Sequence, residues 1–117
     1  MKLQEIVDKL NLSVKTAPGK LDTDIETGYA SDLLSDVIAN GKEGDLWVTL
    51  QIHPNIVAVA SMKGISGIVI INSREPEEDT VKKAEDEQMP IMVSDLPGFE
   101  LIGKLYTMGI LGTRNGV

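Results

Sequence analysis

The chain has 117 residues and a formal net charge of -7, with 11 basic against 18 acidic side chains. This length suits one domain around one hydrophobic core, and the acidic balance argues against nucleic acid or an anionic membrane surface as a partner, because both are bound mainly through Lys and Arg. No cysteine is present, which excludes disulfides and thiolate metal sites and suits a reducing, cytoplasmic environment. No stretch approaches the ~20 apolar residues of a membrane span.

The first predicted helix has its apolar residues on one face, at i, i+3, i+4 and i+7: Leu3, Ile6, Val7 and Leu10. Two extended segments follow, separated by the turn residues Ala17-Pro18-Gly19: residues 13–16 and 25–30. The N-terminal quarter therefore predicts one amphipathic helix and two short strands.

The next helix is expected to begin at Ser31, whose hydroxyl can accept a hydrogen bond from the first turn, and to end at Asn40-Gly41. Residues 46–50 then read as a buried strand. Pro54 suits the first position of a helix, where its missing N–H costs nothing, and that helix ends at Lys63-Gly64.

An unbroken β-branched run over 68–71 is typical of a strand covered on both faces, as in a parallel sheet. Pro76 is expected to open the following helix, with acidic residues in its first turn, where the helix dipole favours negative charge. A short strand over 91–93 and a helix over 99–110 complete the series, and the tail 111–117 is expected to fray.

Strands and helices alternate from Ile25 onward with short connections. This order favours a mostly parallel sheet with right-handed crossovers and helices on both faces. The predicted fold class is therefore α/β, a three-layer α/β/α sandwich formed by residues 1–117 as one domain.

Two of the predicted helices carry more apolar residues than one buried face requires. In the first, over 56–62, apolar side chains cover nearly the whole circumference, and in the second, over 99–111, they exceed a single stripe. We expect the excess to be buried against a second copy, so that the chain is a homodimer.

No segment carries the G-x-x-x-x-G-K-[ST] loop that cradles phosphates in nucleotide hydrolases. His53 is the only histidine, so a His-pair metal motif is excluded, and no cofactor, metal site or catalytic residue set is expected. His53 follows a predicted strand end, where open α/β sheets place ligand sites, yet it also suits a helix cap. Both interpretations stay open.

Polar residues follow several predicted strand ends and could line one edge of the sheet. Each also has a structural explanation as a cap or turn former. The helix N-termini at that edge, together with Arg74, favour an anionic or phosphate-bearing ligand. The candidate ligand-binding residues are Ser31, Asp32, Gln51, His53, Asn55, Ser73, Arg74 and Asp95.

Several stretches, taken together, resemble DRTGG-domain proteins across almost the whole chain: residues 28–36, 44–49, 53–61, 67–70, 90–91 and 99–100. Such domains are similar to the N-terminal domain of HPr kinase/phosphorylase and occur fused to CBS-containing pyrophosphatases. The literal motif is missing, because Gln51-Ile52-His53-Pro54 and Asn72-Ser73-Arg74-Glu75 occupy the loops where Asp-Arg and Thr-Gly-Gly usually lie.

The resemblance implies an HPr kinase N-terminal-domain-like fold and a non-enzymatic regulatory or subunit-contact role, with a small anionic metabolite or nucleotide as the ligand to test. It carries no catalytic residue onto this chain. Two alternatives remain: a structural subunit of a cytoplasmic complex, and an HPr-kinase-related phosphoryl-transfer enzyme.

Overall fold

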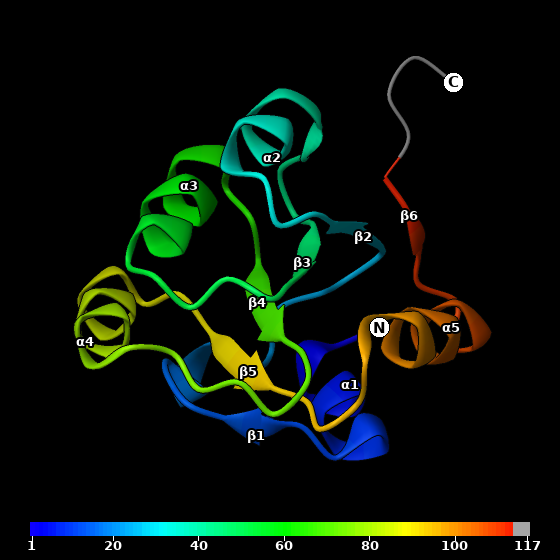
Figure 1. Cartoon of the computed structure of the whole chain (residues 1–117). Helices are drawn as coiled ribbons and strands as arrows, with labels where there is room; N and C mark the ends of the chain where they lie inside the picture. The colour runs from blue at the N-terminus through cyan, green and yellow to red at the C-terminus, as the bar shows by residue number, and fades with distance from the viewer. Residues whose placement is uncertain (114–117) are drawn as a thin grey trace.

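A computed structural model describes residues 1–113 of the chain (Figure 1). Its helices are α1 (Leu3–Leu10), a short 3-10 turn η1 (Pro18–Lys20), α2 (Leu34–Asn40), α3 (Asn55–Lys63), α4 (Glu78–Glu87) and α5 (Gly98–Thr107). Its strands are β1 (Ser13–Val14), β2 (Thr27–Ala30), β3 (Leu46–Thr49), β4 (Gly67–Ile70), β5 (Ile91–Val93) and β6 (Leu111–Gly112).

The strands form one six-stranded sheet in the order β1-β5-β4-β3-β2-β6. Every neighbouring pair is parallel except β1 and β5, which are antiparallel. The predicted mostly parallel sheet is therefore confirmed, with one short antiparallel strand at its edge.

Helices cover both faces of the sheet, which confirms the three-layer α/β/α arrangement (Figure 1). On one face α2, α3 and α4 pack over a core that includes Trp47, Ile68 and Ile70. On the other, α1 and α5 pack over Val48 and Val69. Alternate side chains of β3 and β4 thus enter opposite cores, because successive side chains of a strand point to opposite faces.

Helices α4 and α5 differ in extent from the sequence prediction. Glu77 is extended and its N–H donates to the carbonyl oxygen of Ile52 at 3.1 Å, so α4 begins at Glu78 and Pro76 lies in the preceding loop. Gly109 takes a left-handed φ of 96°, which ends α5 at Thr107, three residues earlier than the apolar pattern suggested.

The expectation of a frayed tail is wrong for Leu111 to Thr113. The backbone N–H groups of Leu111 and Thr113 donate to the carbonyl oxygens of Glu26 and Gly28 at 3.3 and 2.9 Å, so β6 adds a parallel edge strand to β2. Residues 114–117 lie outside the described part of the chain. Sequence pattern missed β6 because a strand this short has no period to detect.

The excess apolar surface of α3 is largely covered within the chain. This helix lies between α2 and α4 on its face of the sheet (Figure 1), and Ile56, Val57, Val59 and Ala60 are buried. The apolar circumference of α3 therefore does not by itself call for a second subunit. The argument for a second subunit therefore depends on α5.

A buried carboxylate ties the amino end of β3 to both strands beyond it. Asp45 is 0% exposed and accepts hydrogen bonds from the Thr27 hydroxyl at 2.6 Å, from the Lys42 N–H at 2.8 Å and from the Thr113 hydroxyl. Buried carboxylates persist only when hydrogen-bonded or paired. Asp45 thus connects β2, β3 and the residue after β6.

Replacing Asp45 by Ala should lower the free energy of unfolding by about 3 kcal/mol, because three donors lose one shared acceptor. Urea unfolding followed by circular dichroism measures the change. Asp86→Ala, at an exposed position on α4, should change it by less than about 0.5 kcal/mol. Equal effects of the two substitutions would contradict the anchoring role of Asp45.

Candidate functional site

The candidate residues follow four parallel strands and lie at one edge of the sheet. The loops 31–33, 50–54, 71–77 and 94–97 come after β2, β3, β4 and β5, all four of which run in the same direction. Loops 50–54 and 71–77 are side by side, because the carbonyl oxygen of Ile52 accepts hydrogen bonds from the Glu77 N–H at 3.1 Å and the Thr80 hydroxyl at 2.7 Å.

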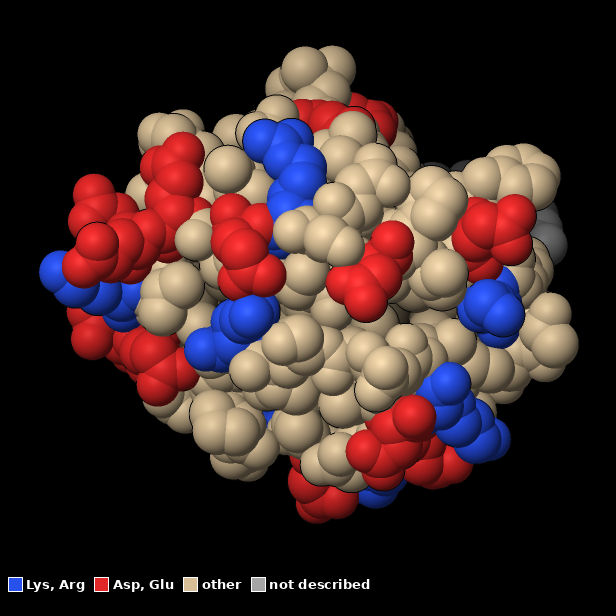
Figure 2. Space-filling model, turned by 60° about the horizontal axis from the view of Figure 1, so that its bottom comes forward, with Lys and Arg blue, Asp and Glu red and all other residues tan. Residues whose placement is uncertain are grey.

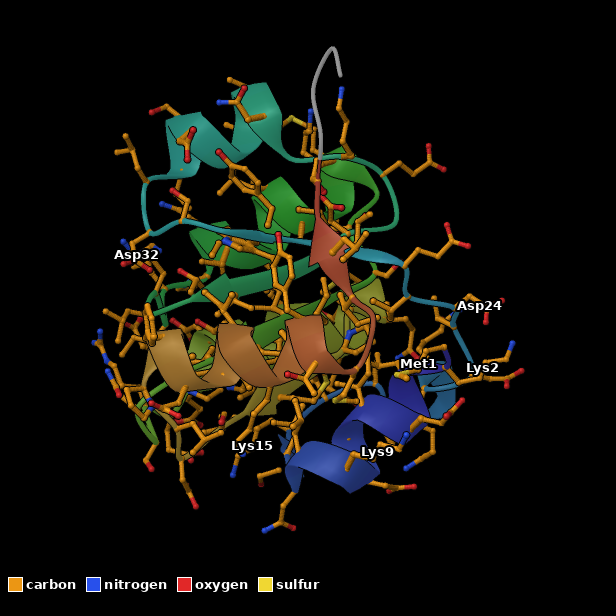
Figure 3. All side chains as sticks on the ribbon, turned by 90° about the vertical axis from the view of Figure 1, so that its right-hand side faces the viewer. Met1, Lys2, Lys9, Lys15, Asp24 and Asp32 are labelled. Carbon is orange, nitrogen blue, oxygen red and sulfur yellow. The ribbon has the colours of Figure 1, made fainter. Side chains whose placement is uncertain are left out.

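Asp32 and Gln51 form one group of contacts at this edge. One Asp32 carboxylate oxygen accepts from the Thr49 hydroxyl at 2.9 Å and from the Leu50 N–H at 2.7 Å. The Gln51 side-chain amide donates to the Asp32 carbonyl oxygen at 2.9 Å. In Figure 3, Asp32 lies at the end of the molecule far from Met1. Thr49, which the sequence analysis did not single out, completes this group.

Ser73 and Asp95 form a second group. The Ser73 hydroxyl donates to Asp95 at 2.8 Å, and the Ser73 N–H donates to the Ser94 carbonyl oxygen, also at 2.8 Å. Asn72 and Ser73 have φ values of 59° and 56°, a left-handed conformation that costs about 1 kcal/mol or more for a residue other than glycine. The hydrogen bonds of Ser73 to Ser94 and Asp95 hold this strained turn in place.

The second group lies between β4 and β5, two neighbouring strands whose following helices pack on opposite faces of the sheet. The chain passes from β4 to α4 on one face and from β5 to α5 on the other (Figure 1). Open α/β sheets bind ligands in the crevice at such a point. Here hydrogen bonds bridge the two loops, including one from the Asn72 N–H to the Leu96 carbonyl oxygen at 3.0 Å.

His53 lies one residue before Pro54, the N-cap residue of α3, and its side chain binds the first residue of that helix. Its Nδ1 accepts a hydrogen bond from the Asn55 N–H at 3.1 Å, at the start of α3. His53, Asn55 and Arg74 are exposed, and no ion pair joins Arg74 to another residue within 1–113. These three side chains therefore remain accessible to a ligand at the edge.

Ser31 does not cap α2 as expected. Its hydroxyl accepts from the Leu33 N–H at 3.2 Å, and α2 begins only at Leu34. Its carbonyl oxygen instead accepts from the indole N–H of the buried Trp47 at 2.9 Å. This hydrogen bond from Trp47 connects the loop after β2 to β3.

A polar cluster beside Ser31 was not predicted. The Tyr29 hydroxyl lies 2.9 Å from both carboxylate oxygens of Asp36, and the Asn40 side chain donates to Asp36 at 2.8 Å. Hydrogen bonds from Asn40, Ser31 and Tyr29 hold the pKa of Asp36 below its usual value. The i,i+4 spacing of Asp36 and Asn40 on a helix was the available signal.

Two hollows in the described surface lie beside α5. One, of about 260 Å³, is lined by residues of β2, α5 and β6, and its lining is mostly apolar. The other, of about 570 Å³, lies between the end of α1 and α5 and includes Ser94, Asp95, Lys9 and Lys104. Asp95 is the one candidate residue that lines either hollow.

The described residues contain no group of three or more His, Asp or Glu side chains that could hold a metal ion. Within the same residues, no helix has the length and apolar character to cross a membrane. Acidic side chains gather over α4, at the left of Figure 2, while acidic and basic side chains are interspersed over the rest of the face shown.

Asn72→Gly should raise the free energy of unfolding by about 1 kcal/mol, because glycine takes the left-handed conformation without strain. Chemical denaturation measures the gain. As a matched control, Ser35→Gly within α2 should lower stability by about 0.5–1 kcal/mol. A loss of stability in Asn72→Gly would mean that the Asn72 side chain offsets its strain.

Burial raises the pKa of Tyr29 above 10.0, and its hydrogen bond to Asp36 and the Asp36 charge raise it further. The folded state therefore retains the Tyr29 proton more tightly than the unfolded chain, and stability should fall as the pH rises above about 10. Asp36→Asn should lower the Tyr29 pKa and reduce this loss. Tyrosine titration by NMR in the wild type and in Asp36→Asn measures both effects; an unchanged Tyr29 pKa would contradict the assignment.

Three comparisons relate the chain to known proteins. No family model matches it. It is 28% identical, over 111 residues, to an uncharacterized protein of Methanocaldococcus jannaschii, and the match covers 89% of this chain and 36% of that protein.

Among solved structures, the fold is similar to the CBS and DRTGG domains of the regulatory region of Clostridium perfringens pyrophosphatase, complexed with the activator diadenosine tetraphosphate. The TM-score is 0.69 at 13% sequence identity, and the match covers 93% of this chain and 47% of that one. The chain thus spans about a third of the curated relative and about half of the solved chain. It has a DRTGG-like α/β fold.

Proposed function

We propose that the chain is a non-enzymatic regulatory or subunit-contact module that forms a homodimer and binds a small anionic metabolite or nucleotide at the carboxyl edge of its sheet. The observation that carries this proposal is the fold shared with a pyrophosphatase regulatory region complexed with a nucleotide activator. We further propose that residues 1–117 act as one domain of the DRTGG type.

The ligand is best placed at the start of α3. This helix has no acidic residue in its first turn, and its N-terminus carries the positive end of the helix dipole. By contrast, α4 begins with Glu78 and Asp79, which repel an anion. Arg74 and His53 are exposed on the two adjoining loops and can donate hydrogen bonds to a phosphate or carboxylate.

The remaining candidate residues support the shape of this edge. Asp32 and Gln51 hold the loops after β2 and β3 together, and Ser73 and Asp95 do the same for the loops after β4 and β5. A ligand at the start of α3 therefore meets loops that are already ordered, which reduces the entropy lost on binding.

An enzymatic role has less support, because phosphoryl transfer requires a phosphate cradle and a positioned metal or base. The sequence contains no phosphate-binding loop, and the described residues form no metal-ligand group. ATP turnover that is lost in His53→Ala or Asp32→Ala would favour the enzyme alternative.

The experiment is isothermal titration of the purified chain with diadenosine tetraphosphate, ATP and inorganic phosphate. We expect one of these anions to bind, with affinity about tenfold weaker in Arg74→Ala, since a charged hydrogen bond contributes about 1.4 kcal/mol. His53→Ala should weaken binding in the same direction.

Lys20→Ala is the control, because Lys20 is exposed on η1, and the adjoining Leu21 carbonyl oxygen accepts a hydrogen bond from the Gln4 N–H at the start of α1 rather than from the four loops. It should leave the affinity unchanged. Equal losses in Arg74→Ala and Lys20→Ala would indicate general charge attraction and remove the site from the proposal. If none of these anions binds, the ligand-binding part of the proposal is rejected and only the subunit-contact role remains.

A further inference from the structure

The outer face of α5 is not covered by any other described element. In Figure 3 this helix crosses the face turned to the viewer, with β6 above it and α1 below it. Phe99 is 90% exposed and Tyr106 is 52% exposed, while Leu101 and Leu105 on the opposite side of the helix are buried in the core. Two exposed aromatic residues on one face, beside an apolar groove, make this side of α5 a candidate interaction surface.

An apolar groove runs beside these aromatic residues. It has a volume of about 260 Å³ and is lined by residues of β2, α5 and β6. Tyr106 of α5 forms part of its wall, and the Tyr106 hydroxyl accepts a hydrogen bond from the Gly112 N–H of β6 at 3.0 Å. Its lining includes Val48, Ile102, Ile110 and Leu111. The face of α5 therefore offers both a protruding side chain, Phe99 near the start of the helix, and a hollow beside its end.

Gly103 lies at the centre of the same face. A Cβ atom built there meets no atom within 4 Å, so nothing in the described chain prevents a larger residue. Glycine inside a helix is costly relative to alanine. A helix approaching closely from outside would make use of the missing side chain.

The charges on this face are arranged for pairing with an inverted copy. Glu100 and Lys104 lie one turn apart on the flank of α5 away from the aromatic residues, and neither forms an ion pair within residues 1–113. If a second α5 runs antiparallel about a two-fold axis near residue 102, Glu100 of each copy faces Lys104 of the other.

The same operation brings the apolar flanks together. Residues at similar distances from the axis exchange places in an isologous pair, so Phe99, three residues before position 102, comes opposite Tyr106, four residues after it, in the other copy. The rise of about 1.5 Å per residue places these two side chains about 10 Å apart along one helix. Phe99 is therefore positioned to enter the groove at the far end of the second α5.

We propose that two copies of this chain associate through an antiparallel pair of α5 helices, crossing at Gly103, with each Phe99 seated in the groove between α5 and β6 of the other copy. This inference rests on the proposed homodimer but not on the proposed ligand site. The groove is mostly apolar and the flanking charges are self-complementary, which favours a second copy over a differently charged partner.

Sedimentation equilibrium and light scattering test the interface. The wild type should be a dimer at micromolar concentration, and Phe99→Asp should weaken association about thirtyfold or more, as for a central aromatic contact. Met62→Asp is the control, because Met62 is also exposed, at 63%, but lies on α3 on the other side of the sheet. The Met62→Asp variant should form a dimer with the same affinity as the wild type.

Gly103→Gln provides a variant that should keep its helix, because Gln is the better helix former. Circular dichroism should show an intact fold, while light scattering shows a monomer. Glu100→Lys and Lys104→Glu should each weaken association, and the double variant should restore it to about the wild-type value, because the swapped charges pair again.

A monomeric wild type would overturn both this interface and the proposed homodimer; if that monomer bound an apolar dye in the groove, a small ligand would be the occupant instead. A dimer that survives both Phe99→Asp and Gly103→Gln would leave the homodimer standing and reject this interface. Failure of the charge-swapped double variant to recover association would reject the antiparallel arrangement.

Discussion

The burial of β4 on both faces is the constraint on which the architecture depends. Ile68 and Ile70 enter one core, and Val69 and Ile71 enter the other. A strand that is apolar on both sides must be covered on both sides, and parallel neighbours with helical crossovers meet this need. This burial requires helices on both faces of the sheet, and the parallel strands place the loops that follow them at one edge.

More helices pack on one face of the sheet than on the other, and this difference decides how much apolar surface each helix leaves exposed. Helices α2, α3 and α4 lie next to one another, so the apolar circumference of α3 is shared between the sheet and two neighbouring helices. On the opposite face, α5 carries the chain from β5 across to β6 with only α1 on that side of the sheet. An apolar helix without a second neighbour keeps Phe99 and Tyr106 exposed.

The polar residues of the sheet serve to hold its ends in place. Asp45 joins three strands at the amino end, while Asp32 and Asp95 join loops at the carboxyl end. Carboxylates suit this work because each can accept several hydrogen bonds. The candidate site and the scaffold therefore share residues, and substitution of Asp32 or Asp95 would change the loops as well as any contact to a ligand.

Sequence alone determined the α/β class and the alternation of strands and helices, because apolar period and turn residues are local properties. It also placed polar residues at strand ends, such as Asp32 after β2 and Ser73 after β4. Only the tertiary structure decided which of them meet. Pairs such as Ser73 with Asp95 depend on strand order, which no local pattern records.

The same distinction explains why the two overfilled helices have different surroundings and why the sequence pattern missed β6. Both overfilled helices look alike in sequence, but whether a helix has one neighbour or two is a property of the packed layers: α3 lies between α2 and α4, and α5 has no such pair of neighbours. The residues after Gly109 have too few apolar positions to predict a strand, yet they form β6 because β2 and the buried carboxylate of Asp45 hold them there. Contacts between segments distant in sequence decided both outcomes, since their energies depend on the neighbours that the fold brings together.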